Sequence, residues 1–183
     1  MIKVTEEILL EPINEMHATA MFDLVDANRE YLRTWLPWVD NMRSVESFNN
    51  HIAYCRKCES EGTDFAFMIM FNNKMIGRIG IHYIHQHNRS GSIGYWLAGD
   101  LQGKGIMTKA CIAIIDHSFN VLGLNRVEIK CAVGNSKSQA IPERLKFVKE
   151  GILRGAELVN GKYLDINLYS MLKNEWKNRS TDQ

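Results

Sequence analysis

The sequence lacks an excess of charge of one sign and lacks any long apolar run. Its 183 residues carry a formal net charge of +1, from 22 Lys and Arg against 21 Asp and Glu. A protein that binds nucleic acid through bulk positive charge is therefore excluded, and no direct nucleic-acid partner is predicted. The apolar runs are interrupted every few residues, so none reaches the length that spans a membrane, and no membrane partner is predicted.

The N-terminus also lacks the pattern of a secretory signal, because residues 1–10 show no cationic start followed by a sustained apolar stretch. We therefore expect a cytoplasmic location. At 183 residues, 45% of them hydrophobic, residues 1–183 are expected to form one domain with a sizeable core. Internal repeats and low-complexity segments are absent, and disorder is predicted only for residues 178–183.

Four cysteines are present, but they lack the arrangement of a metal site. Cys55 and Cys58 have the C-x-x-C spacing of a zinc or redox pair, yet no second pair of Cys or His follows at similar spacing. His82, His85 and His87 are close in sequence without an acidic residue beside them. We therefore predict reduced thiols and no metal, and we interpret the histidines as exposed or as contacts on the substrate side.

Strand and helix patterns alternate along the chain. Expected strands cover residues 9–12, 64–71, 74–84, 91–97, 126–133, 151–158 and 163–171. Expected helices begin near Asn14, near Ser44 or Ser47, near Gly103, and near Asn135 or Ser136. The resulting order is strand, two helices, three strands, helix, strand, helix, two strands. This order favours an α+β fold with a mixed sheet over a doubly wound parallel sheet.

The segment 92–108 is the most informative part of the chain. It has the pattern of a buried strand, a tight Gly-rich turn and the first turn of an amphipathic helix. Such a turn directs several backbone N–H groups at one point, and the helix dipole adds partial positive charge there. We therefore predict a phosphate site, such as one for the pyrophosphate of a nucleotide-bearing cofactor. The Walker pattern is absent, and Thr108 stands where a dinucleotide fingerprint has its third glycine.

The pattern Gln102-x-x-Gly105 before a helix resembles the acetyl-CoA loop of the GNAT superfamily of acyl-CoA-dependent N-acetyltransferases. The run 103–108 is similar to the branch that acetylates the N-termini of ribosomal proteins, although Met107 departs from the usual small residue. The element order also matches the GNAT fold over residues 9–172. The resemblance implies an α+β (α/β) fold with a mixed, mostly antiparallel sheet, splayed in the middle and flanked by helices. Acetyl-CoA would lie in the wedge between the two splayed strands, which are the strand that ends near Leu97 and the strand 126–133.

The resemblance also implies which residues contact the cofactor. The backbone of Trp96, Leu97 and Ala98, exposed at a bulge, would hold the thioester carbonyl and stabilise the oxyanion. The phosphates would be bound by the residues of the turn, which are Gln102, Gly103, Lys104, Gly105, Ile106, Met107 and Thr108.

The second motif, Asn135-Ser-Lys-Ser138, resembles the N-x-x-S that opens a later helix in this family. In that case Asn135 would hydrogen-bond the pantetheine arm of the cofactor, and Ser138 would donate a proton to the leaving thiolate. The same two residues are also good helix caps. Lys146-Phe147 stands where the family usually has Gly-Phe, which removes the residue best suited to a left-handed helix end.

A general base is needed because a protein N-terminal amine has a pKa near 8 and is mostly protonated at neutral pH. Glu157 occupies the position of the base inferred for the ribosomal-protein branch, and burial in a cleft would raise its pKa. Two alternatives stay open. Glu157 could be a solvated or ion-paired strand residue, and water could relay the proton without a dedicated base.

We therefore predict an acetyl-CoA-dependent N-acetyltransferase that works by direct transfer in a ternary complex. The acceptor is the N-terminal amine of a ribosomal or other protein. Alternatives are a small amine, such as a polyamine, an amino sugar or an antibiotic, and a non-catalytic acyl-CoA sensor. The presence of both Ser138 and Glu157 favours an enzyme over a sensor. A homodimer is implied by the resemblance alone.

Overall fold

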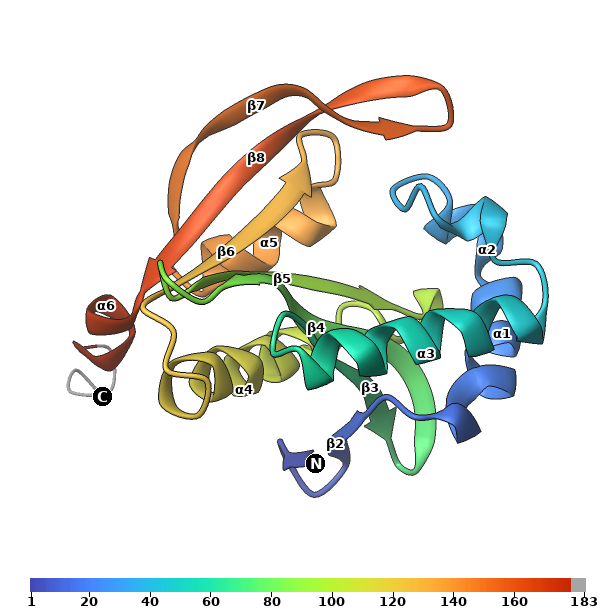
Figure 1. The fold of residues 1–183 in the computed structure, drawn as a ribbon. Coiled ribbons are helices and arrows are strands. Elements are labelled where there is room, and N and C mark those ends of the chain that lie inside the picture. The colour runs from blue at the N-terminus through green and yellow to red at the C-terminus, as the bar shows by residue number, and fades with distance from the viewer. Residues whose placement is uncertain (179–183) are drawn as a thin grey trace.

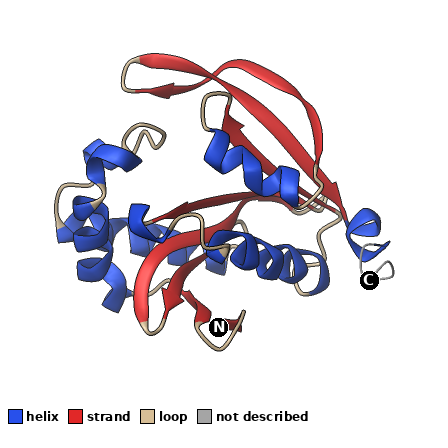
Figure 2. Ribbon diagram, turned by 180° about the vertical axis from the view of Figure 1, so that it is seen from behind, coloured by secondary structure: helices blue, strands red, loops and turns tan. Residues whose placement is uncertain are grey.

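The computed structural model describes residues 1–178, in which a mixed eight-stranded sheet carries helices on both faces (Figures 1 and 2). The strands are β1 (Ile2–Lys3), β2 (Ile8–Pro12), β3 (Phe65–Phe71), β4 (Lys74–His85), β5 (Ser90–Leu97), β6 (Arg126–Ala132), β7 (Val148–Val159) and β8 (Lys162–Leu172). Their spatial order is β1-β2-β3-β4-β5-β6-β8-β7, and only β5 and β6 pair in parallel among the described strands. The expected α+β architecture is confirmed, with β1 as an unexpected addition.

The helices are α1 (Ala18–Ala27), α2 (Arg29–Leu32), α3 (Val45–Ser60), α4 (Ile106–Asn120), α5 (Ser136–Arg144) and α6 (Lys173–Asn178). Helices α1 and α3 lie on one side of the sheet, and α4 and α5 lie on the other (Figures 1 and 2). None of the helices in residues 1–178 is both long and apolar enough to cross a membrane. The disorder expected for residues 178–183 is wrong for Asn178, which ends α6, and residues 179–183 lie outside the described chain.

Short-range signals explain most element boundaries. Asn72 and Asn73 have positive φ angles of 48° and 61°, which allows the tight turn between β3 and β4. Ser44 caps α3 by accepting a hydrogen bond from a backbone N–H of its first turn. Asn14 caps the short 3-10 turn Glu15–His17 instead of α1. Met16, in that turn, is 90% exposed.

Two apolar clusters pack against the two faces of the sheet. Ile79, Ile93 and Val127 are buried in the cluster under α4. Met68 and Trp96 are buried in the cluster under α1 and α3. Burying one such side chain stabilises a fold by about 1.5–3 kcal/mol, so the alternation of apolar residues along β4 and β5 fixes which face each polar residue takes. Cys55 and Cys58 belong to the inner side of α3, where both are free thiols and 6% exposed.

The sheet opens between its two parallel strands. Strand β5 pairs with β6 only from Ser90 to Ile93, opposite Arg126 to Ile129. Beyond these residues the two strands separate, and their remaining backbone groups on the facing edges have no partner in the other strand. The splay expected in the middle of the sheet is therefore present.

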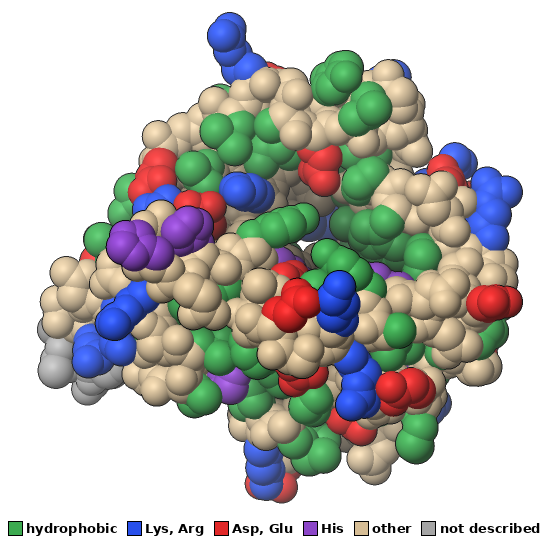
Figure 3. Space-filling model, viewed as in Figure 1, with side chains coloured by type: hydrophobic (Ala, Val, Ile, Leu, Met, Phe, Trp, Pro, Cys, Tyr) green, Lys and Arg blue, Asp and Glu red, His purple; other side chains and the backbone are tan. Residues whose placement is uncertain are grey.

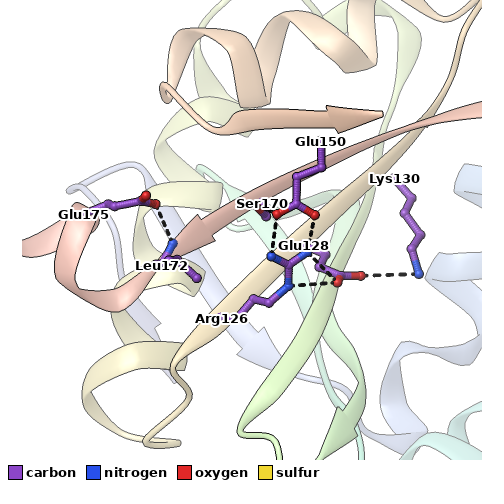
Figure 4. Close-up of polar contacts among 7 residues, drawn as sticks. All are labelled: Arg126, Glu128, Lys130, Glu150, Ser170, Leu172 and Glu175. Atoms are coloured by element: carbon purple, nitrogen blue, oxygen red, sulfur yellow. Dashed lines mark hydrogen bonds and ion pairs between the residues drawn. The ribbon is translucent and has the colours of Figure 1, made fainter. Parts of the chain in front are cut away.

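Arg126 joins β6 to the bulged strand β7 at the closed end of the opening (Figure 4). Its guanidinium lies 2.6 Å from Glu150 and 2.9 Å from Glu128, and Ser170 Oγ donates to Glu150 at 2.7 Å. The register of β7 and β8 shifts between Lys149 and Gly151, which places Glu150 in the bulge. Hydrogen bonds from Arg126 and then Ser170 lower the pKa of Glu150 to about 2.

We expect Arg126→Met to lower the free energy of unfolding at pH 7 by about 1–2 kcal/mol, because the ion pairs are partly screened by solvent. This corresponds to a fall in Tm of about 2–8 °C in calorimetry for a chain of this size. The contribution of Glu150 is present above its unfolded pKa of about 4.3 and is lost as the pH falls toward about 2. The difference from wild type should therefore shrink over that window. Lys3→Met, which breaks the exposed pair with Glu6, is the control and should change Tm little.

Candidate functional site

The turn between β5 and α4 forms the expected cradle of backbone N–H groups. Gly103 and Gly105 have φ angles of 77° and 75°, and a Cβ on either would meet nothing within 4 Å. The glycines are therefore required by backbone conformation and not by lack of space. The carbonyl of Gly105 accepts from the N–H of Lys109 at 3.1 Å, so the N–H groups of the first turn have no intrahelical acceptor. With the helix dipole, these groups can bind phosphate.

Helix α4 begins at Ile106, three residues later than expected, because Gly105 takes the left-handed conformation just before it. Ile106 and Met107 are 3% and 7% exposed and belong to the apolar cluster under α4. Met107 therefore departs from the family pattern without obstructing the turn, since its side chain points into the core. Lys104 is exposed at the tip of the turn.

Polar side chains from three elements surround this turn. The Gln102 side-chain N–H donates to the hydroxyl of Tyr31 in α2, and Lys137 Nζ on α5 donates to the Gln102 side-chain oxygen at 3.0 Å. Arg144, at the end of α5, donates to Thr108 Oγ1 at 2.9 Å. The turn is therefore flanked by the cations of α5, which adds positive charge where the helix dipole is already positive.

The backbone of Leu97 faces the open side of β5. Ala98 N–H donates to Ile76 O on β4 at 2.8 Å, whereas the next pair along the ladder joins Leu97 and Gly77. Hydrogen-bonded and non-bonded pairs alternate in an antiparallel ladder, so the Leu97 N–H points away from β4 and toward the wedge. Pairing of β4 with β5 is regular from Gly77 to His82, so the implied bulge near Trp96 is absent. Because β6 departs from β5, the Leu97 N–H is left without a strand partner. The Ala98 N–H cannot serve in the same way, because it is already bonded to Ile76 O.

Ser138, in the first turn of α5, is tied to β5 and β6 by contacts with Tyr95 and Cys131. Asn135 caps α5 by accepting the Ser138 N–H at 3.1 Å. Tyr95 donates its hydroxyl hydrogen to the Ser138 carbonyl at 3.0 Å, and Ser138 Oγ lies 3.4 Å from the Tyr95 hydroxyl oxygen. The same Oγ lies 3.2 Å from the buried Cys131 Sγ. Burial raises the pKa values of Tyr95 and Cys131, so both stay protonated at neutral pH.

Glu157 lies on the inner side of the β7–β8 hairpin. Glu157 is half-buried and Val159 is buried in a strand whose other residues are mostly exposed, and residues two apart share one face of a strand. Burial raises the pKa of Glu157. A second register shift precedes it, where Gly155 at φ 56° donates its N–H to Asp165 at 2.8 Å. The bulge therefore turns the carboxyl inward.

The wedge opens into a hollow bounded by the N-terminal helices. Figure 3 shows this hollow at the centre of the molecule, between the β7–β8 hairpin above and α3 below. Asn160 at the hairpin tip donates to Arg33 O at 2.8 Å, and Asn28 accepts from Gly99 N–H at 2.9 Å. Trp35 lies beside Gly134, where an added Cβ would come within 3.3 Å of its ring. The segment around α2 thus contacts both walls of the hollow.

Three residues of this site were not found from the sequence. Tyr95 lies two residues before Leu97 on the same face, so strand alternation could have placed it. Cys131 was expected only as one of the reduced thiols, and its contact with Ser138 depends on how α5 packs on β6. Arg144 carries no sequence signal, because it meets Thr108 only through the packing of α5 near α4.

Lys146 takes the left-handed conformation, at φ 57°, where the family has glycine.

Known proteins share this sequence and architecture. The family model "Acetyltransferase (GNAT) domain" matches residues 7–148. YdaF of Bacillus subtilis (strain 168) is 36% identical over 176 residues, which are 96% of both chains. The ribosomal-protein-serine acetyltransferase of Escherichia coli (strain K12) is 33% identical over 171 residues, 93% of this chain and 96% of that one.

Among solved structures, RimL, a ribosomal L7/L12 alpha-N-protein acetyltransferase in complex with CoA, superposes with a TM-score of 0.92 at 31% identity. The match covers 95% of this chain and 98% of RimL. The family model spans most of the chain, and the relatives match over nearly their whole length. The chain therefore belongs to the GNAT family of acetyltransferases.

Proposed function

We propose that this chain, as a single catalytic domain, transfers the acetyl group of acetyl-CoA to the N-terminal amine of a ribosomal protein. The observation that supports the proposal is the opening between β5 and β6, whose neighbouring elements carry the Leu97 N–H, the Ser138 hydroxyl and the free N–H groups that open α4. The relatives named for ribosomal-protein serine and for L7/L12 support a protein N-terminus as acceptor.

Acetyl-CoA supplies the acetyl group as an activated thioester. The Leu97 N–H is aimed to stabilise negative charge on the carbonyl oxygen, a contribution of roughly 3 kcal/mol where single donors of this kind have been removed. Ser138 donates a proton to the departing sulfur, and Glu157 accepts the proton of the amine. Asn135 offers its side-chain amide to the pantetheine arm, since its side-chain oxygen already caps α5. Transfer is direct, and no residue of the chain is acylated.

The residues at the α4 turn fit the phosphates of this cofactor. The turn offers unpaired N–H groups with open space above Gly103 and Gly105, and Lys104, Lys137 and Arg144 add charge around it. Arginine forms strong charge-assisted hydrogen bonds with phosphate. Arg144 thus extends the phosphate site beyond the residues of the motif itself.

We expect Arg144→Met to raise KM for acetyl-CoA about tenfold and to leave kcat within about twofold, since the loss of a charge-assisted hydrogen bond affects substrate binding and not the reacting atoms. Steady-state kinetics at saturating acceptor measures both constants. Arg56→Met removes an exposed arginine of α3 that pairs with Glu15, and it should change neither constant. An unchanged KM in Arg144→Met would remove Arg144 from the phosphate site.

The function is tested by offering radiolabelled acetyl-CoA with two classes of acceptor. One is a set of ribosomal proteins purified with free N-termini, and the other is a set of small amines that includes spermidine. We expect one acetyl group on a protein N-terminal amine, located by peptide mass spectrometry. Label on small amines alone, or on lysine side chains alone, would contradict the proposal. Retention of acetyl-CoA without transfer to any acceptor would favour the sensor.

Two features of the proposal concern the whole protein. A cytoplasmic location follows from an acceptor that is a ribosomal protein.

A homodimer is supported by β7, which forms one edge of the sheet and exposes the apolar side chains of Ile152, Leu153 and Leu158 at 51%, 40% and 51%. Isolated edges with apolar side chains favour association. Analytical ultracentrifugation should give twice the chain mass, and a monomer at micromolar concentration would contradict the dimer.

A further inference from the structure

Part of the sheet face turned toward the hollow, on the central strands, is polar. His82 on β4 pairs with Ser92 on β5, Ser92 pairs with Glu128 on β6, and Glu128 pairs with Ser170 on β8. One step toward the opening the row continues with Gly94, which is exposed in the middle of β5. Residues that face each other across a sheet share one surface, so these groups form a continuous polar floor.

Arg78 lies at the edge of this floor, opposite Trp96 in the ladder. Its Nη2 contacts the Cys55 sulfur of α3 at 3.5 Å, and its Nε is buried without a hydrogen-bond partner. Within residues 1–178, the ion pairs of the structure include none to Arg78. A half-buried guanidinium without a carboxylate is costly unless a ligand supplies one.

The ionisable groups around Arg78 do not neutralise it. Burial and then Arg78 itself lower the pKa of His51 to about 4, so this imidazole is neutral at pH 7. Burial and then Arg78 also lower the pKa of His82. Burial raises the pKa of the Cys55 thiol. The Asp64 carboxylate is hydrogen-bonded to His82 Nδ1 at 2.8 Å. A positive charge therefore remains at the rim of the hollow.

The position of Arg78 relative to Leu97 selects which part of an acceptor can reach it. Facing Cα atoms in a ladder lie about 4.5–5.5 Å apart, so Arg78 starts beside the neighbour of Leu97 and extends from there to α3. An extended peptide advances about 3.3 Å per residue. A peptide with its amine at Leu97 that runs across the floor toward α3 would bring its second or third residue near Arg78.

We propose that Arg78 is a specificity-determining residue that binds a carboxylate carried by the second or third residue of the acceptor polypeptide. The proposal rests on the proposed function, since it assumes a peptide N-terminus at the wedge. Arg78 donates to the carboxylate through the guanidinium hydrogens that Cys55 does not use. The site thus discriminates among N-termini by charge at a distance from the reacting atoms.

The test compares peptide acceptors that begin with serine and carry Asp or Asn at the second or third position. We expect wild type to show a kcat/KM about tenfold higher for the Asp peptides, in line with a charge-assisted hydrogen bond. Arg78→Gln should abolish this preference, and Arg78→Lys should keep part of it. In both variants kcat/KM for the Asn peptides and KM for acetyl-CoA should stay within twofold of wild type. Arg56→Gln, an exposed arginine of the same side of the molecule, is the matched control and should keep the preference.

The outcomes separate the two proposals. Equal kcat/KM for Asp and Asn peptides in wild type, or a preference that survives in Arg78→Gln, overturns the role of Arg78 and leaves the enzyme's function intact. Acetylation of none of the peptides overturns the proposed function together with this inference. If Arg78→Gln does not fold, as judged by thermal melting, Arg78→Lys decides. The proposal is overturned if Arg78→Lys keeps the full kcat/KM preference for the Asp peptides and calorimetry shows that it binds the Asp and Asn peptides with equal affinity.

Discussion

Glu157→Gln should lower kcat/KM at pH 7 by about 10²–10⁴-fold, the range that removal of a general base covers. Glutamine keeps the size and hydrogen-bonding capacity of the side chain and removes only the ability to accept the amine proton. The structure supports this role because Glu157 is half-buried on the inner side of the hairpin, where burial raises its pKa. KM for acetyl-CoA should stay within about twofold, since the proposed phosphate site is at the α4 turn, away from Glu157.

The pH profile separates a base from a structural residue. The active form of Glu157 is the carboxylate, so the wild-type rate should rise as the pH increases through its raised pKa. In Glu157→Gln the rate should instead follow the free amine, whose pKa is near 8, and the two enzymes should converge above that pH. A variant with the wild-type rate and profile would leave water as the proton acceptor.

Loss of folding would not explain a slow Glu157→Gln enzyme. A carboxyl whose pKa is raised in the folded state binds more protons there than in the unfolded state, so its ionisation lowers stability as the pH rises through that pKa. Glutamine avoids this cost. The variant should therefore melt at or above the wild-type temperature at pH 7, and calorimetry measures this directly.

Ser138→Ala should lower kcat by about 10²-fold, because it removes the proton donor for the departing sulfur. Affinity for CoA should change little, since the role proposed for Ser138 concerns the leaving group and not the phosphates. Ser136→Ala, an exposed serine in the first turn of the same helix, is the control and should keep wild-type kcat. An unchanged kcat in Ser138→Ala would assign the donor elsewhere, with Tyr95 at 3.4 Å from Ser138 Oγ as the next group.

Cys131 offers a separate check on direct transfer, because its thiol lies 3.2 Å from Ser138 Oγ. A cysteine in this place could carry the acetyl group in a two-step reaction. Burial raises the pKa of Cys131 and keeps it as the less nucleophilic thiol. We therefore expect Cys131→Ala to retain catalysis and rapid-quench experiments to show no burst of acetyl-enzyme. A burst that disappears in Cys131→Ala would contradict the direct mechanism.

The sequence predicted the element order, the phosphate turn, the Asn135 cap and the position of Glu157 on a strand. These features depend on residues close together in the chain: Gly103 and Gly105 permit left-handed backbone, and Asn135 reaches its own helix. The predicted start of the first helix was wrong, because Asn14 caps a short 3-10 turn that precedes α1. The prediction of a bulge at Trp96 was also wrong, because β5 pairs regularly with β4 there. Such pairing depends on the partner strand and not on the local sequence.

The sequence alone therefore determined the fold class and the motifs, since backbone conformation, capping and alternation act over a few residues. Only the tertiary structure decided which side chains meet: Tyr95 with Ser138, Arg144 with Thr108, and Arg78 with Cys55. These relations arise from the register of β4, β5 and β6 and from the packing of α5 and α3 on the sheet. Contacts between residues far apart in the chain depend on how whole elements dock, and no local pattern records that.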